Sequence, residues 1–242
     1  ATSTSAAEAT ITKNIGSVSN RGVEVVFDID VLRKKDFRWN IGFNGTRLIN
    51  KIVKLPEENR EKGIVSGTKR YVEGGGIYDY WMYKYEGVDQ MTGRALYAPN
   101  LETYYIGEPV EGKTQFPAQY LVQINGKDYS TFHTYAAKDW AGSAIPDFYG
   151  SVSTSLSYKN FDLSALFTYS LGGKTYDASY RSLMSVTANA SAIHQDVKNA
   201  WNGVPSGITE TSANRVDPNG IPSIDYGLSQ YHDTESSRWL ID

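Results

Sequence analysis

Apolar and polar side chains alternate through residues 23–31, which read VEVVFDIDV. The apolar positions of one parity are Val23, Val25, Phe27, Ile29 and Val31. The opposite parity carries Glu24, Asp28 and Asp30, with Val26 as its apolar exception. Because successive side chains of a strand point to opposite faces of the sheet, this period of two predicts a strand with one apolar and one polar face.

A second alternating run follows after the polar break at residues 33–36. Its apolar positions are Phe37, Trp39, Ile41 and Phe43, and its other positions are Arg38, Asn40, Gly42 and Asn44. Two alternating runs joined by a short polar segment predict an antiparallel hairpin.

The register of this hairpin has two possible solutions. A slip of one residue would turn one apolar face over, so the loop must hold an odd number of residues. A loop of five pairs Val31 with Phe37 and sets Asp30 opposite Arg38, which is a favourable pair of charges. A loop of three also aligns the faces, without that pair.

Residues 148–172 form a second pair of alternating runs. The apolar positions are Val152, Leu156, Tyr158, Phe161, Leu163, Ala165, Phe167, Tyr169 and Leu171. Here the two apolar sets have opposite parity, so a two-residue turn at Lys159-Asn160 aligns them and places Tyr158 opposite Phe161. Asn tolerates the positive φ that such a turn requires.

Composition excludes several classes of protein. The 242 residues include no Cys, so disulfides and thiolate metal sites are ruled out, and a net charge of -3 offers no basic field for nucleic acid. No apolar run approaches the roughly 18 residues that a membrane helix needs. Residues 1–10 are small and polar, unlike a secretory signal. The 18 Tyr and 22 Gly favour β structure with many turns.

The connections of the two hairpins are asymmetric. Each hairpin near 15–48 and 148–172 has a tight turn at one end, while the segments near 48–147 and 173–236 are long. Outer-membrane barrels combine short periplasmic turns with long extracellular loops, and strands of about 10 residues cross their apolar layer. We therefore expect an all-β chain that is part of a large antiparallel transmembrane β-barrel. A soluble β-sandwich is the alternative, because its strands also alternate. The polar residues expected to face the barrel lumen are Glu24, Asp28, Asp30, Arg38, Asn40 and Asn44.

Several stretches resemble one family in the order in which that family carries them. Residues 14–24 read NIGSVSNRGVE, 35–40 read KDFRWN, 83–93 read YKYEGVDQMTG, 146–163 contain PDFYG and YKNFDL, and 236–242 read SSRWLID. These stretches resemble the SusC/RagA-like TonB-dependent transporters of the bacterial outer membrane. The resemblance covers most of residues 14–242 and is weak in 98–135 and 175–235.

The resemblance implies that the complete transporter is larger than this chain. Family members have barrels of about 22 strands filled by an N-terminal plug. They are driven by TonB, and a SusD-like surface lipoprotein closes over them as a lid during import of oligosaccharides or peptides. The chain resembles the C-terminal third of such a protein, without plug, coupling segment or last strands. Because four to six strands cannot close a barrel, we expect the remainder of the barrel and outer-membrane lipid as its partners.

Aromatic residues in the long segments are candidates for contact with cargo or lid, because aromatic faces stack on sugars and pack against peptides. The candidates are Tyr78, Tyr80, Trp81, Tyr83, Tyr85, Tyr104, Tyr105 and Trp140. A strand over residues 76–85 would place Tyr78 and Tyr80 on one face and Trp81, Tyr83 and Tyr85 on the other, followed by a turn at 88–93. Alternatively, these residues form part of the barrel rim.

We predict that the chain is not an enzyme and holds no cofactor. His133, His194 and His232 fall in predicted loops without a catalytic motif, and Glu57-Glu58 indicates a solvated loop. Calcium could bind Asp217, Asn219 and Asp225, although their spacing is not that of an EF-hand. A passive porin and an extracellular hydrolase remain as further alternatives. Residues 190–201 could hold a short helix, residues 95–97 a short strand, and residues 237–242 the start of another strand.

Overall fold

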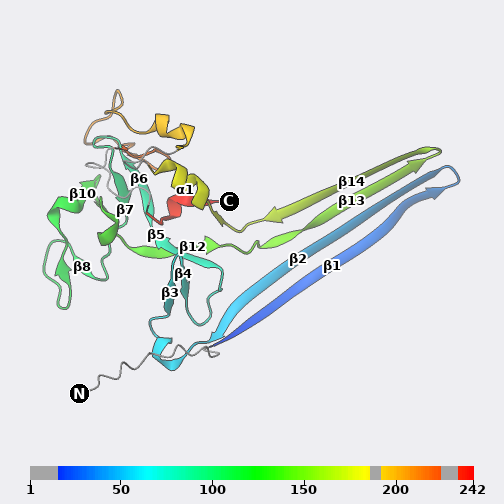
Figure 1. The fold of residues 1–242 in the computed structure, drawn as a ribbon, viewed down its shortest axis with the longest axis horizontal. Coiled ribbons are helices and arrows are strands. Elements are labelled where there is room, and N and C mark those ends of the chain that lie inside the picture. The colour runs from blue at the N-terminus through cyan, green and yellow to red at the C-terminus, as the bar shows by residue number, and fades with distance from the viewer. Residues whose placement is uncertain (1–15, 186–191, 225–233) are drawn as a thin grey trace, which may run out of the picture.

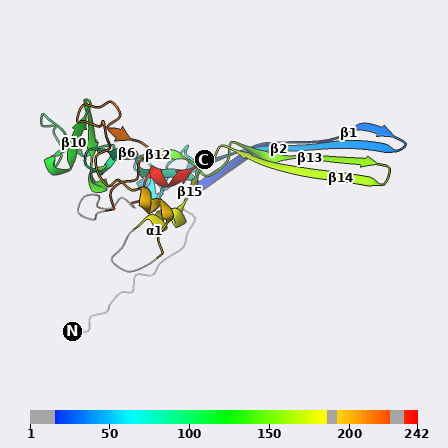
Figure 2. The same ribbon diagram turned by 90° about the horizontal axis from the view of Figure 1, so that it is seen from above.

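The computed structural model describes residues 16–185, 192–224 and 234–242. A long, thin arm of four strands projects from a lobe that contains the remaining elements (Figure 1). In the view turned by 90°, the arm is a single sheet thick (Figure 2). Among the described helices, none has the length and hydrophobicity needed to cross a bilayer.

The arm consists of two hairpins that pair with each other. It contains β1 (Ser17–Lys34), β2 (Phe37–Lys54), β13 (Phe148–Tyr158) and β14 (Phe161–Leu171), in the spatial order β1-β2-β13-β14. All three pairings are antiparallel. Both tight turns lie at the free end of the arm, and the long connections lie at the lobe end (Figure 1). The predicted all-β class and the asymmetry of turns and loops are confirmed, although β1 and β2 are longer than expected, with 18 residues each.

The five-residue loop predicted for the first hairpin is wrong. The body of the hairpin pairs Phe27 with Phe43 and Ile29 with Ile41, which is the register of the three-residue alternative. A β-bulge between Asp30 and Leu32 then shifts the register, so that the turn itself holds only two residues. The Asp30–Arg38 pair is absent. Instead the Asn40 side-chain amide donates to Asp28 Oδ1 at 2.6 Å and to Asp30 Oδ1 at 3.3 Å.

The second hairpin has the predicted register. Tyr158 pairs with Phe161 and Leu156 with Leu163 across a two-residue turn. The residue with positive φ is Lys159, at 53°, and not Asn160 as expected. The positive φ therefore falls on the first residue of the turn, Lys159, although Lys adopts positive φ less readily than Asn.

The two faces of the arm differ in polarity across all four strands. The register aligns Asn44 with Ser151 and Asn40 with Ser155, so the polar residues of β1 and β2 continue into the serines of β13. Asn44 Nδ2 donates to Ser151 Oγ at 2.6 Å, which links the two hairpins on this face. The six predicted lumen residues belong to it: Glu24, Asp28, Asp30, Arg38, Asn40 and Asn44.

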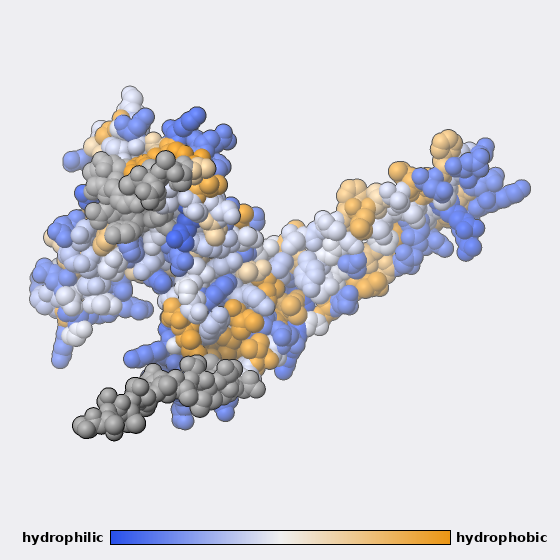
Figure 3. Space-filling view, viewed as in Figure 1, coloured by the Kyte–Doolittle hydropathy of each residue, from blue (hydrophilic) through white to orange (hydrophobic). Residues whose placement is uncertain are grey.

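The opposite face is apolar and uncovered. Val23 is 68%, Phe161 79% and Phe167 66% exposed, and hydrophobic residues are visible along the arm (Figure 3). Soluble monomers rarely expose a continuous apolar surface of this kind. No second sheet covers it among the described residues, so the arm is not one half of a β-sandwich, and its exposed apolar face is of the kind expected for a barrel wall.

Tyr169 fastens the junction of the two hairpins. Its hydroxyl donates to the Asn44 carbonyl at 2.8 Å, across the intervening strand β13. The ring stacks near Phe148, with centroids 5.5 Å apart, and near Phe43, at 6.2 Å. Gly150 makes room for this crossing, because a Cβ there would lie 2.0 Å from the Asn44 oxygen and 2.7 Å from the Tyr169 hydroxyl.

The lobe contains two small sheets and several short elements. The five-stranded sheet has the order β10 (Leu121–Ile124), β11 (Lys127–Ser130), β7 (Ala95–Tyr97), β6 (Tyr85–Asp89), β16 (Val216–Asp217). The four-stranded sheet has the order β12 (Lys138–Ser143), β5 (Asp79–Tyr83), β4 (Lys69–Tyr71), β3 (Ile64–Ser66). Two further pairs are β15 (Thr175–Tyr176) with β17 (Leu240–Ile241), and β8 (Tyr104–Tyr105) with β9 (Thr114–Gln115).

The helical elements of the lobe are short. The α-helix is α1 (Ala178–Met184), capped by Asp177, whose side chain accepts the Tyr180 N–H. The 3-10 turns are η1 (Glu57–Asn59), η2 (Ala118–Tyr120), η3 (His133–Tyr135), η4 (Gln195–Asn199) and η5 (Ser237–Trp239). The helix predicted in 190–201 is, in its described part, only the turn η4, and α1 was not predicted. The strand expected from 237 begins at Leu240, after η5.

The single strand predicted over residues 76–85 is divided between the two sheets of the lobe. Residues 76–85 do not form a single strand, because β5 ends at Tyr83 and β6 begins at Tyr85 in the other sheet. The turn predicted at 88–93 starts later, since Val88 and Asp89 belong to β6. The predicted strand β7 is confirmed. It is buried on both faces, with Leu96 against Ile124 and Tyr129, and its other two residues against Ala136.

We predict that Gly150→Val will destabilise the arm by about 1–3 kcal/mol, because the new side chain overlaps Asn44 and displaces Tyr169. Urea unfolding of the detergent-solubilised protein measures the loss. Ser155→Val, which adds the same side chain at an exposed position of β13, is the control and should change stability by less than about 0.5 kcal/mol. Equal effects of the two substitutions would contradict the role of the crossing.

Candidate functional site

Two of the motifs that identify the family-like pattern pack against each other. Tyr83 bridges to Ser236, and the Tyr85 N–H donates to Ser237 Oγ at 3.1 Å. The Arg238 guanidinium lies 4.4 Å from the centre of the Trp239 ring and 5.6 Å from that of Tyr85. Trp239 itself is 1% exposed. The segment 235–239 therefore packs onto the junction of β5 and β6 and leads into β17, which pairs with β15.

Tyr85 is partly buried in this packing. Its hydroxyl donates to the Gly220 carbonyl at 3.2 Å, and its ring lies edge-on to Tyr97 at 5.8 Å. Burial raises the pKa of Tyr85 to about 12. The hydroxyl therefore stays protonated and remains a hydrogen-bond donor at any physiological pH.

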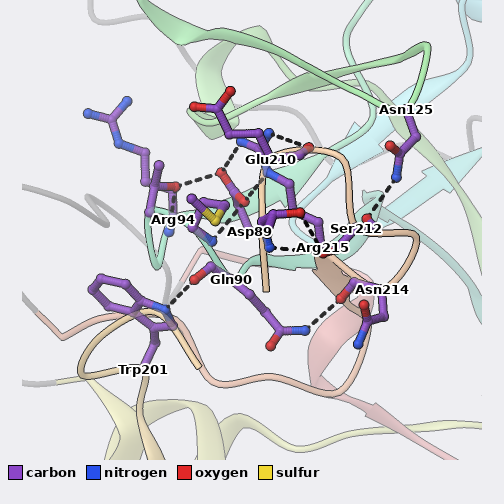
Figure 4. A network of polar contacts seen from close by, with 12 residues as sticks. Asp89, Gln90, Arg94, Asn125, Trp201, Glu210, Ser212, Asn214 and Arg215 are labelled. Carbon is purple, nitrogen blue, oxygen red and sulfur yellow. Dashed lines mark hydrogen bonds and ion pairs between the residues drawn. The ribbon is translucent and has the colours of Figure 1, made fainter. Parts of the chain in front are cut away.

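A buried carboxylate holds the second half of the lobe to the first (Figure 4). Asp89 is 1% exposed and forms a two-point ion pair with Arg215, at 2.8 Å to Nε and 2.9 Å to Nη2. It also accepts the Met91 N–H at 3.1 Å and the Thr92 hydroxyl at 2.9 Å. Burial alone would raise the pKa of Asp89, but Arg215 and these two donors outweigh it and the pKa is lowered. The same pairing raises the pKa of Arg215.

Two glycines of the same motif allow close packing around this ion pair. Gly87, with φ of 130°, lies where a Cβ would be 2.5 Å from the Asp217 carbonyl oxygen. Gly93, with φ of 71°, lies under the Trp201 ring, where a Cβ would approach to 2.3 Å. The Trp201 indole N–H in turn donates to the Gln90 carbonyl at 2.8 Å (Figure 4). The turn after β6 therefore packs closely against residues 200–223 and holds them in place.

Three of the predicted contact residues meet on one surface of the lobe. Trp81 and Trp140 are cross-strand partners, with ring centres 5.0 Å apart in an edge-to-face arrangement. Arg70 lies 4.6 Å from the Trp81 ring and Lys138 lies 4.7 Å from the Tyr83 ring. An adjoining depression of about 670 Å³, called here the aromatic hollow, is lined by Trp81, Tyr83, Pro99, Asn100, Leu101, Glu102, Lys113, Thr134, Ala136, Ala137 and Lys138.

The other predicted contact residues lie elsewhere. Tyr80 is 7% exposed in the core, with Lys69 Nζ 3.4 Å from its ring centre, while Tyr78 is 47% exposed outside the hollow. Tyr104 packs edge-on to Phe116 and Tyr135, and Tyr105 is its half-buried neighbour in β8. The cations Arg70 and Lys138 were not predicted. Only strand pairing brings them to the aromatic rings, so no local pattern could have indicated them.

The candidate metal and catalytic residues do not assemble into a site. His133 lies in η3, His194 caps η4 with Nδ1 3.3 Å from Asp196 Oδ2, and His232 lies outside the described residues. Asp217 Oδ1 accepts the Asn219 N–H at 2.9 Å, which forms a turn, and Asp225 lies outside the described residues. Within the described ranges no group of three or more His, Cys, Asp or Glu could hold a metal ion. Calcium binding stays a prediction.

Comparisons with known proteins give relatives of one kind. The chain is 29% identical over 198 residues to the TonB-dependent receptor P3 of Formosa agariphila, which covers 78% of this chain and 18% of the relative. It is 25% identical over 199 residues to the TonB-dependent receptor SusC of Bacteroides thetaiotaomicron, covering 80% of this chain and 17% of SusC. No family model matches.

A solved structure of the RagAB peptide transporter has the same fold. It superposes with a TM-score of 0.59 at 19% identity, covering 89% of this chain and 22% of the matched chain. The chain resembles one segment of a SusC/RagA-type TonB-dependent receptor. It spans less than a quarter of the length of the relatives it matches.

This SusC/RagA-like chain is accordingly a piece of outer-membrane barrel. Its relatives are receptors and transporters rather than enzymes, so the prediction that it is not an enzyme is confirmed and the hydrolase alternative is wrong. The two-faced arm with short turns at one end and long connections at the other agrees with the predicted barrel fold.

We predict that Asp89→Asn will loosen the lobe by about 3 kcal/mol, because it leaves the buried Arg215 without its carboxylate. Because the pKa of Asp89 is lowered on folding, its contribution is complete above the unfolded value of about 3.9 and is lost as pH falls through the lower folded value. Amide hydrogen exchange of β6 should therefore show a loss of protection in acid that the variant lacks. Glu102→Gln, an exposed carboxylate of the lobe, should keep the wild-type profile.

Proposed function

We propose that this chain is the barrel wall and extracellular loops of a transporter that actively imports a nutrient oligomer across the outer membrane. Under this proposal residues 1–242 form a C-terminal segment of the barrel, with the hairpins as wall and the segments 55–147 and 172–236 as extracellular loops. The remainder of the barrel and its plug complete the pore. The observation that carries the proposal is the two-faced arm, apolar and exposed on one side and polar on the other.

The size and order of the lobe support a role beyond barrel closure. A connection between adjacent strands needs only a few residues, yet β2 and β13 are joined by the whole segment 55–147. This segment is folded into sheets, and the ion pair of Asp89 with Arg215 ties it to the second long loop. Long ordered loops are places for recognition. TonB coupling and a SusD-like lid are proposed as partners of the complete protein, because the relatives include SusC and RagAB.

The aromatic hollow is the proposed contact for cargo or lid. Trp81 and Tyr83 supply aromatic rings to its lining, and Lys113, Lys138 and Glu102 supply charged hydrogen-bonding groups. Aromatic rings with a few polar groups suit both sugar rings and peptide side chains. The chemistry therefore supports an oligosaccharide or a peptide, and the uptake assay decides between them.

Uptake in cells tests the active mechanism. A strain that produces the intact polypeptide should accumulate labelled oligosaccharide or peptide only while TonB is present and the inner membrane is energised. Uptake that persists without TonB, and that grows linearly with external concentration, would favour the passive porin and overturn the proposal. Uptake of neither class of cargo would also overturn it.

We predict that Trp81→Ala with Trp140→Ala will lower the affinity for cargo or lid by about tenfold or more, because Trp81 lines the hollow and packs edge-to-face with Trp140 next to it. Equilibrium binding to the purified transporter measures the change. Tyr78→Ala removes an exposed ring of the same segment that lies outside the hollow, and it is the control. Wild-type affinity in the double variant would show that the aromatic hollow is not part of the binding surface.

A further inference from the structure

The lipid-facing side of the first hairpin changes from apolar to basic at the end that joins the lobe. Along β1 this face presents Phe27, then Val25, then Val23, all 44–68% exposed. Past Val23 the register sets Arg21 directly opposite Ile49. On β2 the residues two before and two after Ile49 are Arg47 and Lys51. No register shift separates these positions from Phe27, so the three cations share the face of the apolar residues.

The three cations are close together and have no counter-charge among the residues that the structure describes. Arg47 and Lys51 are diagonal neighbours of Arg21 across the strand pair, a position that places side chains about 7–8 Å apart. All three are exposed, and none belongs to an ion pair of the described residues. This face of β1 and β2 has no Asp or Glu at all. Like charges placed together on a sheet repel each other and destabilise it. A bound anion from outside the chain would relieve this repulsion.

An open groove with apolar walls includes two of the three cations, Arg21 and Lys51. It has a volume of about 500 Å³ and is lined by Ser19, Arg21, Ile49, Lys51, Ile52, Val53 and Gly74. Ile49 is 46% and Val53 is 56% exposed, so apolar surface alternates with the cations. Such a surface fits a molecule that is both anionic and apolar. A soluble polyanion would use the cations and leave the apolar walls in water.

The position along the strand selects the kind of amphiphile. The apolar stretch from Val31 to Val23 is about 26 Å long at about 3.3 Å per residue, similar to the roughly 25 Å apolar band of outer-membrane barrels. The cations begin where that band ends, on the side of the long loops. In a barrel with extracellular loops at this end, that is the level of the lipid phosphates of the outer leaflet.

We propose that Arg21, Arg47 and Lys51 bind the phosphate groups of a phosphorylated outer-leaflet lipid, whose acyl chains lie along the neighbouring apolar face. Guanidinium groups bind phosphate through two parallel hydrogen bonds, and Lys adds a point charge. The site fixes the height of the barrel wall in the membrane beside the lobe. It requires only the membrane orientation of the arm and is independent of cargo, plug and lid.

Lipid binding by the intact polypeptide that contains this chain tests the proposal. The protein is reconstituted in phosphatidylcholine vesicles and titrated with a bis-phosphorylated lipid of the lipid A type. In the triple variant R21Q/R47Q/K51Q we expect affinity to fall on the order of 100-fold, since each cation near an anionic surface contributes about fivefold. Native mass spectrometry of the detergent-purified protein should also lose its lipid adducts.

The matched control removes the same number of cations at the opposite end of the same hairpin. R33Q/K34Q/K35Q changes the tight turn, and its affinity should stay within about threefold of wild type. Folding of both variants is checked by the heat-dependent gel mobility that closed barrels show. Unchanged lipid affinity in the first variant, or an equal loss in both, would overturn the proposal.

Two further outcomes would identify a different occupant. Equal binding of inorganic phosphate alone would mean an anion site without lipid. Loss of a copurifying protein with unchanged lipid affinity would mean a protein interface. Each of these results overturns the lipid proposal. Cargo uptake measured on the same variants separates it from the transport function, because the triple variant should import at the wild-type rate once it is inserted.

Discussion

The pairing of β2 with β13 is the interaction on which the rest of the structure depends. Within the arm every strand must satisfy its backbone groups through neighbouring strands, because lipid offers no hydrogen bonds on the apolar side. The register of β2 and β13 makes one continuous polar face from two hairpins that are far apart in the chain. Tyr169 and Gly150 stabilise this junction through a hydrogen bond and a close approach that only glycine permits.

The same pairing makes the intervening segment a loop, and the loop needs its own architecture. Because β2 and β13 are adjacent antiparallel strands, residues 55–147 leave the sheet at the end of β2 and return at the neighbouring start of β13. The lobe solves this by burying β7 on both faces and by tying distant parts together through Asp89 and Arg215. The return of the chain at 235–239 packs on the β5–β6 junction, so the loops form one folded body with the aromatic hollow on its surface.

The alternation of apolar and polar side chains predicted much of the arm from local sequence alone. It was sufficient for the two hairpins, their faces and the exact turn of the second one, because each depends on residues next to each other along two strands. It was insufficient for the first turn, where a bulge after Asp30 absorbs one residue and leaves the parity argument valid only for the hairpin body. Helix α1 and the division of residues 76–85 into two strands depend on packing partners far away in the chain, which no local period records.

The candidate surfaces divide in the same way. The sequence by itself determined the two-faced strands of the arm, the residues of its polar face and the aromatic richness of the loops, because these follow from residue type and period. Only the tertiary structure decided which aromatic residues are available. It buried Tyr80, partly buried Tyr85, brought Trp81 to Trp140, and added Arg70 and Lys138 beside them. The physical reason is that neighbours across strands are set by register, and register is settled by the whole sheet and not by any one strand.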